Sequence, residues 1–466
     1  MGSSPGDPAR QGLANASPHG VLGAVHTTLG AGLLLQGLAA LASFLVVPML
    51  VSALGSGRFG VLSVIISFGP WLIVLDTGLQ AAMRLLAGET RGASQGRAPA
   101  ALMGRGYRIS ILAMALNAVL VAMALLLLPI QRIFGAEGVV TSGELSLAIA
   151  IFALAVISSS PGVVTLGALE GVGRTVVSAS LGGLGPIAAL PLTMLVIQWG
   201  GSFVELALVQ GLAIAVPRFS ALAYWRWRPS RTDASYATTK LRVSLAGQLA
   251  LLAGLGTAQA GLAPVFVSSM VGAEAAASFG LTWRLITGAL IPMVVLTPLF
   301  TASLAAARGA GWSRGNNRDL LRLLGQAAVV GALAGIALVA LGPFVVQLLG
   351  RGQVLVSSSL WFAGATYLVT TYVAAPFQAA FVGPRALHAS VAIGLVVTVA
   401  SVGLSLVFTP QFGASGPLWA ASIGSIVITV FWIVIWRFWP GLLAEAHTGD
   451  LVEEGVSGDE PITPER

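Results

Sequence analysis

Three charged side chains stand inside long apolar stretches of this sequence: Asp76, Arg218 and Arg284. An ionised group at the centre of a membrane-spanning helix costs about 2.5–3.5 kcal/mol on insertion scales, so such residues usually pair with one another, line a polar cavity or bind a substrate. Asp76 has two interpretations, which the sequence leaves open. One is a structural pair with a nearby arginine or a helix end, and the other is a relay for a proton or a cation.

The arginines occupy different depths in their stretches. Arg218 is only about six residues from the basic end of its stretch, so we expect its guanidinium to extend roughly 9 Å along the helix to the lipid headgroups. Arg284 lies about two helical turns inside, where we expect a cation that faces a cavity. A guanidinium placed there would attract an anionic group such as a pyrophosphate. Arg84 follows Asp76 by eight residues, on nearly the same helical face and at the water boundary.

Amide side chains form a second set of candidates for substrate binding: Gln36, Asn117 and Gln248. Amides that line a cavity can hydrogen-bond sugar hydroxyls, and amides also join neighbouring helices, so both roles stay open. The sequence has no cysteine and four scattered histidines, which predicts no metal site. It also clusters no carboxylates or histidines as a membrane-embedded transferase would need, and we therefore predict that the protein is not an enzyme.

The composition fixes the broad class. Hydrophobic residues make up 56% of the chain and charged residues 9%, which is more apolar surface than a soluble core of this length can bury. The sequence therefore predicts an all-α polytopic membrane protein. The net charge of +7 comes from arginines that fall between apolar runs, where they set orientation, so we expect no nucleic-acid partner.

A spanning helix needs about 20 apolar residues. On this measure we predict twelve helices, over residues 27–54, 60–82, 107–130, 144–167, 175–198, 203–224, 243–270, 277–305, 321–349, 358–382, 389–409 and 417–436. Basic residues concentrate in the loops after the second, sixth and eighth helices, which predicts that both termini are cytoplasmic.

The two halves of the sequence resemble each other. The stretch PMLVSALG, which begins at Pro48, is similar to PVFVSSMVG, which begins at Pro264, at an offset of 216 or 217 residues. A repeat of six helices places both halves the same way up, related by a pseudo-two-fold axis along the membrane normal. We therefore predict two six-helix bundles that face a central cavity, the geometry of an alternating-access transporter. The predicted organisation is a disordered leader (1–26), a first bundle (27–225), a linker (226–240), a second bundle (241–437) and an acidic tail (438–466).

Several short motifs resemble those of bacterial polysaccharide flippases, which belong to the superfamily of multidrug, oligosaccharidyl-lipid and polysaccharide (MOP) exporters. They are LGSGRFG at Leu54–Gly60, LDTGLQAAMRLLA at Leu75–Ala87, ALEGVGR at Ala168–Arg174 and FGASGPLWAA at Phe412–Ala421, together with SSMVGAEAAASFGLTWRL, which ends at Leu285. The resemblance covers nearly the whole apolar region. Its motifs are short and apolar, so they indicate the superfamily more specifically than the subfamily.

The resemblance implies a V-shaped, MATE-like transporter of the bacterial cytoplasmic membrane. It would move a polyprenyl-pyrophosphate-linked oligosaccharide from the inner to the outer leaflet, for assembly of O-antigen lipopolysaccharide, capsule or exopolysaccharide. Arg284, with Arg84 and Arg218 as weaker candidates, would bind the headgroup, and Asp76 falls on the family's aspartate. The resemblance implies H⁺ or Na⁺ coupling and no other cofactor. It also implies contact with membrane lipids, and with the glycosyltransferases and polymerase of the same pathway as partners.

The main alternative is a cation-coupled multidrug exporter of the same fold. Exporters of that kind most often carry an acidic residue in the first or seventh helix, and neither predicted helix has one here. A lipid II flippase usually has two more helices than this chain can form. A major-facilitator transporter would have a short basic motif between its second and third helices, which is absent from this sequence.

Overall fold

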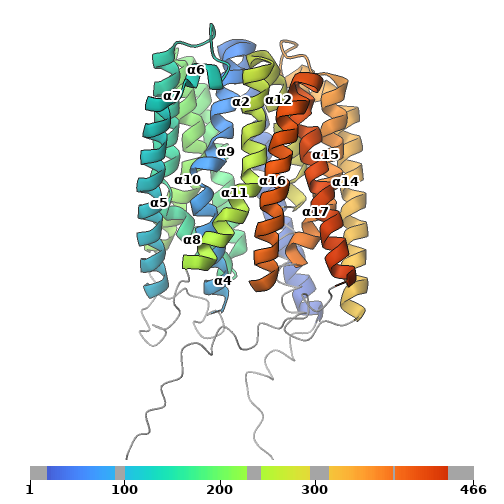
Figure 1. Ribbon diagram of the computed structural model, residues 1–466. Helices are drawn as coiled ribbons and strands as arrows, with labels where there is room; N and C mark the ends of the chain where they lie inside the picture. The colour runs from blue at the N-terminus through green and yellow to red at the C-terminus, as the bar shows by residue number, and fades with distance from the viewer. Residues whose placement is uncertain (1–17, 90–99, 228–242, 294–313, 381–383, 439–466) are drawn as a thin grey trace, which may run out of the picture. The chain divides into compact units, whose positions relative to one another are not determined.

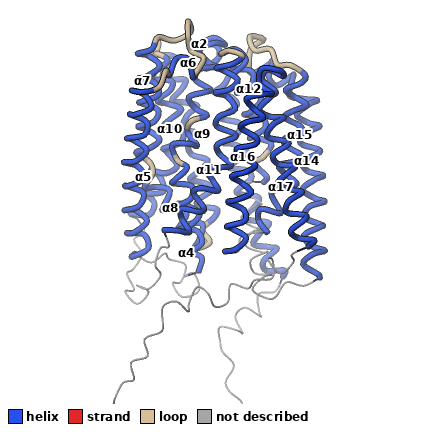
Figure 2. The backbone as a smooth tube through the Cα atoms, viewed as in Figure 1, coloured by secondary structure: helices blue, strands red, loops and turns tan. Residues whose placement is uncertain are grey.

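The computed structural model describes residues 18–89, 100–227, 243–293, 314–380 and 384–438. These residues form helices joined by short turns (Figure 1), and no strand occurs in the part of the chain that they cover (Figure 2). The acidic tail, almost all of the predicted linker and most of the predicted leader lie outside the described residues.

Each of the twelve predicted stretches contains a helix. The first half forms α2 (Pro18–Ser67), α3 (Gly69–Leu72), α4 (Val74–Glu89), α5 (Ala100–Leu127), α6 (Ile130–Ile133), α7 (Ser142–Ser158), α8 (Pro161–Gly171), α9 (Thr175–Gln198) and α10 (Phe203–Trp227). The second half forms α11 (Val243–Met270), α12 (Ala273–Ala289), α14 (Arg314–Leu349), α15 (Ser358–Ala380), α16 (Pro384–Phe412) and α17 (Gly416–Phe438). The all-α, polytopic fold class is thereby confirmed.

Within the described ranges, seven helical stretches are long and apolar enough to cross a membrane, or eight if a bent pair is counted as one span. Two of the seven run through a break in the helix. Leu34–Leu72 continues past Gly55, whose φ of 74° is not helical, and His388–Phe438 includes the short 3₁₀ turn Gly413–Ser415. These two merged stretches account for part of the difference from the twelve predicted helices. The bent pair α7–α8, α12 and α15 are not among the seven.

Prolines break two of the predicted helices. The predicted helix 60–82 is divided among the end of α2, α3 and α4, with Pro70 in the first turn of α3. The predicted helix 144–167 is divided into α7 and α8, which meet at Pro161 with a bend of 42°. Proline has no N–H to donate and its ring clashes with the preceding turn, so it favours a new helix start over continuation.

The turns of the first half recur in the second half. Gly55 (φ 74°) corresponds to Gly272 (φ 122°), and both have ψ close to 170°, at 169° and 167°. Arg351 (φ 50°) has the same left-handed backbone as Gly135 (φ 56°), 216 residues earlier. The backbone therefore repeats as the sequence does.

The chain divides into two compact units. Unit 1 consists of the described parts of Met1–Leu54, Leu75–Ile130 and Thr141–Leu249, and unit 2 of those of Gly55–Val74, Gln131–Val140 and Ala250–Arg466. Two short segments of the first half, Gly55–Val74 and Gln131–Val140, thus belong to unit 2, whereas the predicted bundles place both in the first bundle.

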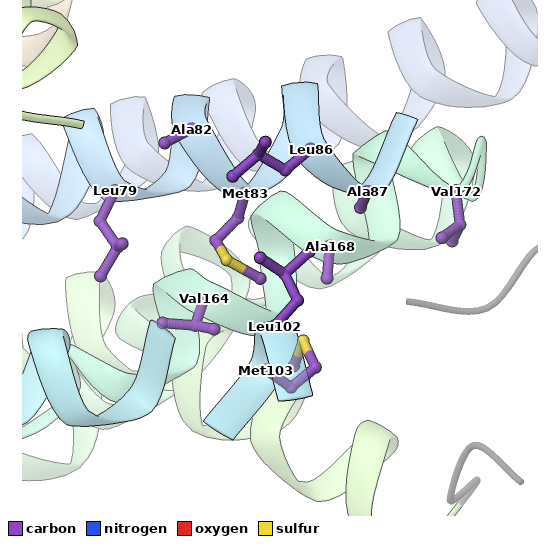
Figure 3. Packing of buried hydrophobic residues seen from close by; sticks show 10 residues of the cluster. All are labelled: Leu79, Ala82, Met83, Leu86, Ala87, Leu102, Met103, Val164, Ala168 and Val172. Atoms are coloured by element: carbon purple, nitrogen blue, oxygen red, sulfur yellow. The ribbon is translucent and has the colours of Figure 1, made fainter. Parts of the chain in front are cut away.

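The interior of unit 1 is packed where α4, α5 and α8 meet. Figure 3 shows Met83 of α4 beside Val164 of α8 and above Leu102 and Met103 of α5, in a cluster that also includes Leu79. Many large apolar side chains elsewhere are exposed, including Leu112, Leu116, Leu126 and Leu127 of α5 and Leu333, Ile336, Leu341 and Phe344 of α14. Exposed leucines on long apolar helices are what a lipid-facing surface requires, so the protein is a multi-pass membrane protein.

Candidate functional site

Asp76 and Arg218 form a buried ion pair inside unit 1. The two side chains come from α4 and α10, and Arg218 Nη1 lies 3.4 Å from Asp76 Oδ2. Asp76 has no exposed surface and Arg218 is 7% exposed. Ser160 donates a hydrogen bond of 2.6 Å to the same carboxylate oxygen, and Arg218 Nη1 lies 3.5 Å from Ser159 Oγ as a second acceptor. The pair therefore connects α4 and α10 with the junction of α7 and α8.

Two helix ends help to hold the carboxylate. Asp76 lies in the first turn of α4, and its partner Ser160 is the residue before the first turn of α8. A negative charge near a helix N-terminus is stabilised by about 0.3–1 kcal/mol, because the free N–H groups there carry partial positive charge. Asp76 Oδ1 is buried and has no hydrogen-bond partner among the described residues.

A glycine allows α8 to approach α10 at this point. A Cβ atom on Gly162 would overlap the backbone carbonyl of Arg218. Only glycine therefore lets the start of α8 lie against the turn of α10 that carries the arginine. The local sequence Ser159-Ser160-Pro161-Gly162 supplies, in order, an acceptor for Arg218, a donor to Asp76, a helix start and the close contact.

The interpretation of Arg218 as a residue that extends to the headgroups is wrong. Its guanidinium turns to Asp76 and stays buried, because a carboxylate without exposed surface offers it a charge-assisted partner inside unit 1. For Asp76, this geometry is the structural pair with a nearby arginine that the sequence left open. The relay interpretation stays a prediction.

A second ion pair lies farther along the same face of α4. Arg84 Nε donates to Glu170 Oε2 of α8 at 2.6 Å, and Arg84 Nη2 lies 2.5 Å from the same oxygen. Gln80 of α4 and Ser178 of α9 both donate to Glu170 Oε1, at 3.1 and 3.0 Å. Asp76, Gln80 and Arg84 are spaced four residues apart, so they form one polar stripe on α4. The Arg84 side chain remains 41% exposed.

The amide candidates lie on three different helices of unit 1. Gln36 of α2 donates to the backbone carbonyl of Ala179 on α9 at 3.4 Å, which is a helix-joining contact. Asn117 is buried on α5, and Gln248 is half-buried on α11. Asp76 and Arg218, two of the residues predicted for the site, are in direct contact.

Arg284 lies in unit 2, half-buried on α12. Its sequence neighbour Trp283 packs against Tyr367 of α15, with ring centroids 5.6 Å apart, and against Phe279, at 6.1 Å. Trp283 and Tyr367 border a small cavity whose other lining residues are Gly256, Ala263, Pro417, Leu418 and Ala421. Arg284 therefore stands on a helix that presents both a cation and an aromatic pair.

Sequence reasoning missed Glu170, Ser159 and Ser160 as polar partners. Glu170 has a local signal, since it is an acidic residue near the end of an apolar run, but its partner is 86 residues away and nothing in the sequence specifies the pairing. Ser160 precedes a proline, which marks a helix start. Among the described residues, no group of three histidine, cysteine or acidic side chains could hold a metal ion.

No protein-family model matches this sequence, and no curated protein matches it. Solved structures do match in fold. An inward-facing conformation of a multidrug resistance MATE family transporter of the MOP superfamily aligns with 88% of this chain and 95% of its own, at 18% identity and a TM-score of 0.63. An outward-facing conformation of a transporter of the same description aligns with 90% of this chain and 95% of its own, at 17% identity and a TM-score of 0.63.

A third structure is a MOP superfamily transporter from Pyrococcus furiosus, described as having a binding pocket of reverse polarity that suggests a different function. It aligns with 90% of this chain and 95% of its own, at 17% identity and a TM-score of 0.58. At these identities the likeness concerns the fold alone. The chain has the fold of the MATE transporters of the MOP superfamily.

Proposed function

We propose that this protein moves a lipid-linked oligosaccharide, carried on polyprenyl pyrophosphate, from the inner to the outer leaflet by alternating access. The product would serve surface polysaccharide assembly. The fold is that of transporters, and the motifs at Leu54–Gly60 and Leu75–Ala87 resemble those of polysaccharide flippases.

The observation that carries the proposal is the sign of the charge in the spans. Neither α2 nor α11 contains an acidic residue, so the positions where multidrug exporters most often hold their acid are neutral here. The buried carboxylate of Asp76 is engaged by Arg218. Arg284 adds a guanidinium on α12, which suits a pyrophosphate better than a cationic drug.

The transporter from Pyrococcus furiosus supports this reasoning by analogy. It is described as having a binding pocket of reverse polarity that suggests a different function, so a change of pocket charge within this fold can accompany a change of substrate class. We propose the same relation here, with Arg284 at the headgroup and Gln36, Asn117 and Gln248 as candidates for the glycan.

A multidrug exporter is the second candidate function. Two of the structures with this fold are described as multidrug resistance transporters, and unit 2 carries the aromatic pair Trp283–Tyr367. The cavity that this pair borders here has a volume of about 20 Å³, which is room for a water molecule and not for a drug. Aromatic faces attract organic cations by about 0.5–2 kcal/mol. Arg284, next to Trp283 in the sequence, would repel a cationic substrate. For this reason we prefer the flippase to the multidrug exporter.

The remaining expectations follow from the same proposal. Transport would draw on an H⁺ or Na⁺ gradient, and the protein would lie in the bacterial cytoplasmic membrane with both termini cytoplasmic. Glycosyltransferases would supply its substrate and a polymerase would consume the product.

The test is a deletion in the organism that encodes the protein, with mass spectrometry of polyprenyl-linked glycans and a parallel assay of surface polysaccharide. We expect a lipid-linked repeat unit to accumulate while surface polymer is lost. Wild-type protein should restore the polymer and Arg284→Gln should not. If the lipid pool is unchanged and the deletion strain becomes more sensitive to cationic drugs, the flippase proposal is wrong and the multidrug exporter takes its place.

A further inference from the structure

Three exposed arginines of unit 1 lie outside the candidate functional site. Arg105 and Arg108 are near the start of α5, three residues apart and therefore on one face of the helix. Arg226 is in the last turn of α10 and is exposed as well. We refer to these three arginines as the basic rim. The proposed function gives them no role, so we consider what they could bind.

Aromatic neighbours place both parts of the rim at the same end of unit 1. Tyr107 of α5 and Trp225 of α10 are half-buried, and both pack against the apolar cluster of α4, α5 and α8 that Figure 3 shows. The Tyr107 hydroxyl also forms a hydrogen bond of 2.9 Å with Thr165 of α8. Side chains with an apolar body and a polar tip are typical of the membrane interface. The rim therefore stands on a fixed aromatic base.

The acidic side chains described in unit 1 do not neutralise the rim. Asp76 and Glu170 are already in the two ion pairs of the candidate functional site. Glu144 and Glu205 lie in the first turns of α7 and α10, at the other end of unit 1 (Figure 1). Along α10, Glu205 is about 30 Å from Arg226. The rim therefore keeps an excess of positive charge.

The rim lies at the depth where lipid headgroups begin. From Ile109 to its last residue, Leu127, α5 carries no charged side chain, and this stretch is about 28 Å long. The hydrocarbon core of a bilayer is about 30 Å thick. Arg108 is thus at the edge of the hydrocarbon, and Arg105 is one turn farther out. Both guanidinium groups can reach the phosphates of the lipid without extending far along the helix.

An exposed apolar row continues from each part of the rim. On α5, Leu112 and Leu116 follow Arg108 at intervals of four residues, so all three share one face, and both leucines are exposed. On α10, the exposed Phe219 comes seven residues before Arg226, on the same face. A ligand that fits both features has a negative charge at one end and an apolar chain at the other. A free phosphate would leave the apolar rows uncovered.

We propose that the basic rim binds the phosphate of an anionic phospholipid of the surrounding bilayer, whose acyl chains lie along the exposed rows of α5 and α10. Guanidinium groups donate charge-assisted hydrogen bonds to phosphate oxygens, and basic residues at the ends of membrane helices favour anionic headgroups. The bound lipid is a structural partner of unit 1 and is not transported. The proposal therefore requires no particular transport substrate.

Native mass spectrometry of the purified full chain in a nonionic detergent tests this proposal. Phosphatidylglycerol and phosphatidylcholine with the same acyl chains are titrated separately, and the dissociation constant of the first bound lipid is measured for each. The rim variant is Arg105→Gln with Arg108→Gln. The control variant is Arg132→Gln with Arg351→Gln, which removes the same charge from two exposed arginines of unit 2. Size-exclusion chromatography checks that each variant is monodisperse.

We expect the parent protein to bind phosphatidylglycerol about tenfold more tightly than phosphatidylcholine. The rim variant should lose this preference, because its affinity for phosphatidylglycerol falls about tenfold while that for phosphatidylcholine is unchanged. Arg105→Lys with Arg108→Lys keeps the charge and should keep most of the preference. Arg226→Gln alone should lower the affinity for phosphatidylglycerol about threefold. The control variant should bind both lipids as the parent does, and an excess of glycerol 1-phosphate should not displace the lipid.

Three results would overturn the proposal. The parent protein could bind both lipids equally, the control variant could lose as much affinity for phosphatidylglycerol as the rim variant, or glycerol 1-phosphate could displace the lipid. The second result would assign the binding to overall charge, and the third to a site for phosphate alone. If the rim variant is not monodisperse, Arg226→Gln is compared with Arg132→Gln in the same way. The assay involves no transport, so failure of the flippase proposal would not change its outcome.

Discussion

Replacing Arg218 by methionine should strongly destabilise unit 1. The substitution keeps most of the side-chain length but removes the cation 3.4 Å from a carboxylate that has no exposed surface. Removing one partner of a buried ion pair typically costs about 3–5 kcal/mol, since the other charge stays buried without compensation. The Ser160 hydrogen bond of 2.6 Å remains, so we expect the lower end, about 3 kcal/mol.

The double variant Asp76→Asn with Arg218→Met should recover most of this loss, because it leaves no buried charge. We expect a coupling energy of about 2 kcal/mol between the two positions. The free energy of unfolding is measured by denaturant titration in mixed micelles with tryptophan fluorescence. Arg226→Met, at an exposed position of the same helix, is the matched control and should change stability by less than about 0.5 kcal/mol.

A coupling energy below about 0.5 kcal/mol would refute the buried pair as described. The same double variant also separates the two interpretations of Asp76. If it folds and transports like the parent, Asp76 is structural. If it folds with near-parent stability but loses transport, the charged pair has a role in transport beyond its structural one.

Three further predictions concern single positions. Glu170→Gln should weaken the link to Arg84, with a stability loss of about 1–2 kcal/mol in the same titration, and the charge swap Arg84→Glu with Glu170→Arg should recover part of it. Gly162→Val should prevent α8 from reaching α10 and reduce the monodisperse fraction in size-exclusion chromatography, whereas Gly104→Ala, where no atom lies within 4 Å, should not. Arg284→Gln should fold normally and abolish glycan export, and Arg284→Lys should retain part of it, as measured by surface polysaccharide staining.

The helices were predicted well because membrane-spanning helices can be recognised in a sequence by their length and apolar composition. The bounds of α9 and α11 agree with the predicted 175–198 and 243–270 to the residue. The breaks at Pro70 and Pro161 were harder to place, because a proline in a spanning helix is compatible with a kink, a new helix start or a continuous helix. Which of these occurs depends on neighbouring helices.

The sequence analysis identified residues of the candidate site, but it did not predict which of them are in contact. Asp76 and Arg218 were identified because each is a charge in an apolar stretch, yet their pairing depends on how α4 and α10 pack, 142 residues apart in sequence. Arg218 was misinterpreted because helix geometry alone makes the lipid headgroups reachable. A buried partner could not be seen from the local sequence.

The contact of the segment Gly55–Val74 with the start of α12 could not be predicted from the sequence. The motif Leu54–Gly60 indicates a turn, and the repeat pairs Gly55 with Gly272, but nothing in either stretch says that Gly60 would lie against Ala273. A close contact that depends on glycine cannot be recognised from the sequence, because glycine also occurs in turns and at helix crossings elsewhere in this chain.

The central claim is that this protein carries a lipid-linked oligosaccharide across the bilayer. The most direct measurement reconstitutes it in vesicles that contain such a lipid in both leaflets, and follows how much of the glycan becomes reactive to a membrane-impermeant oxidant. We predict that the whole pool becomes reactive with the parent protein, and that only the outer-leaflet share reacts with Arg284→Gln or with empty vesicles. The claim would be contradicted if the reactive fraction with the parent protein stayed at the outer-leaflet share, under both an H⁺ and a Na⁺ gradient.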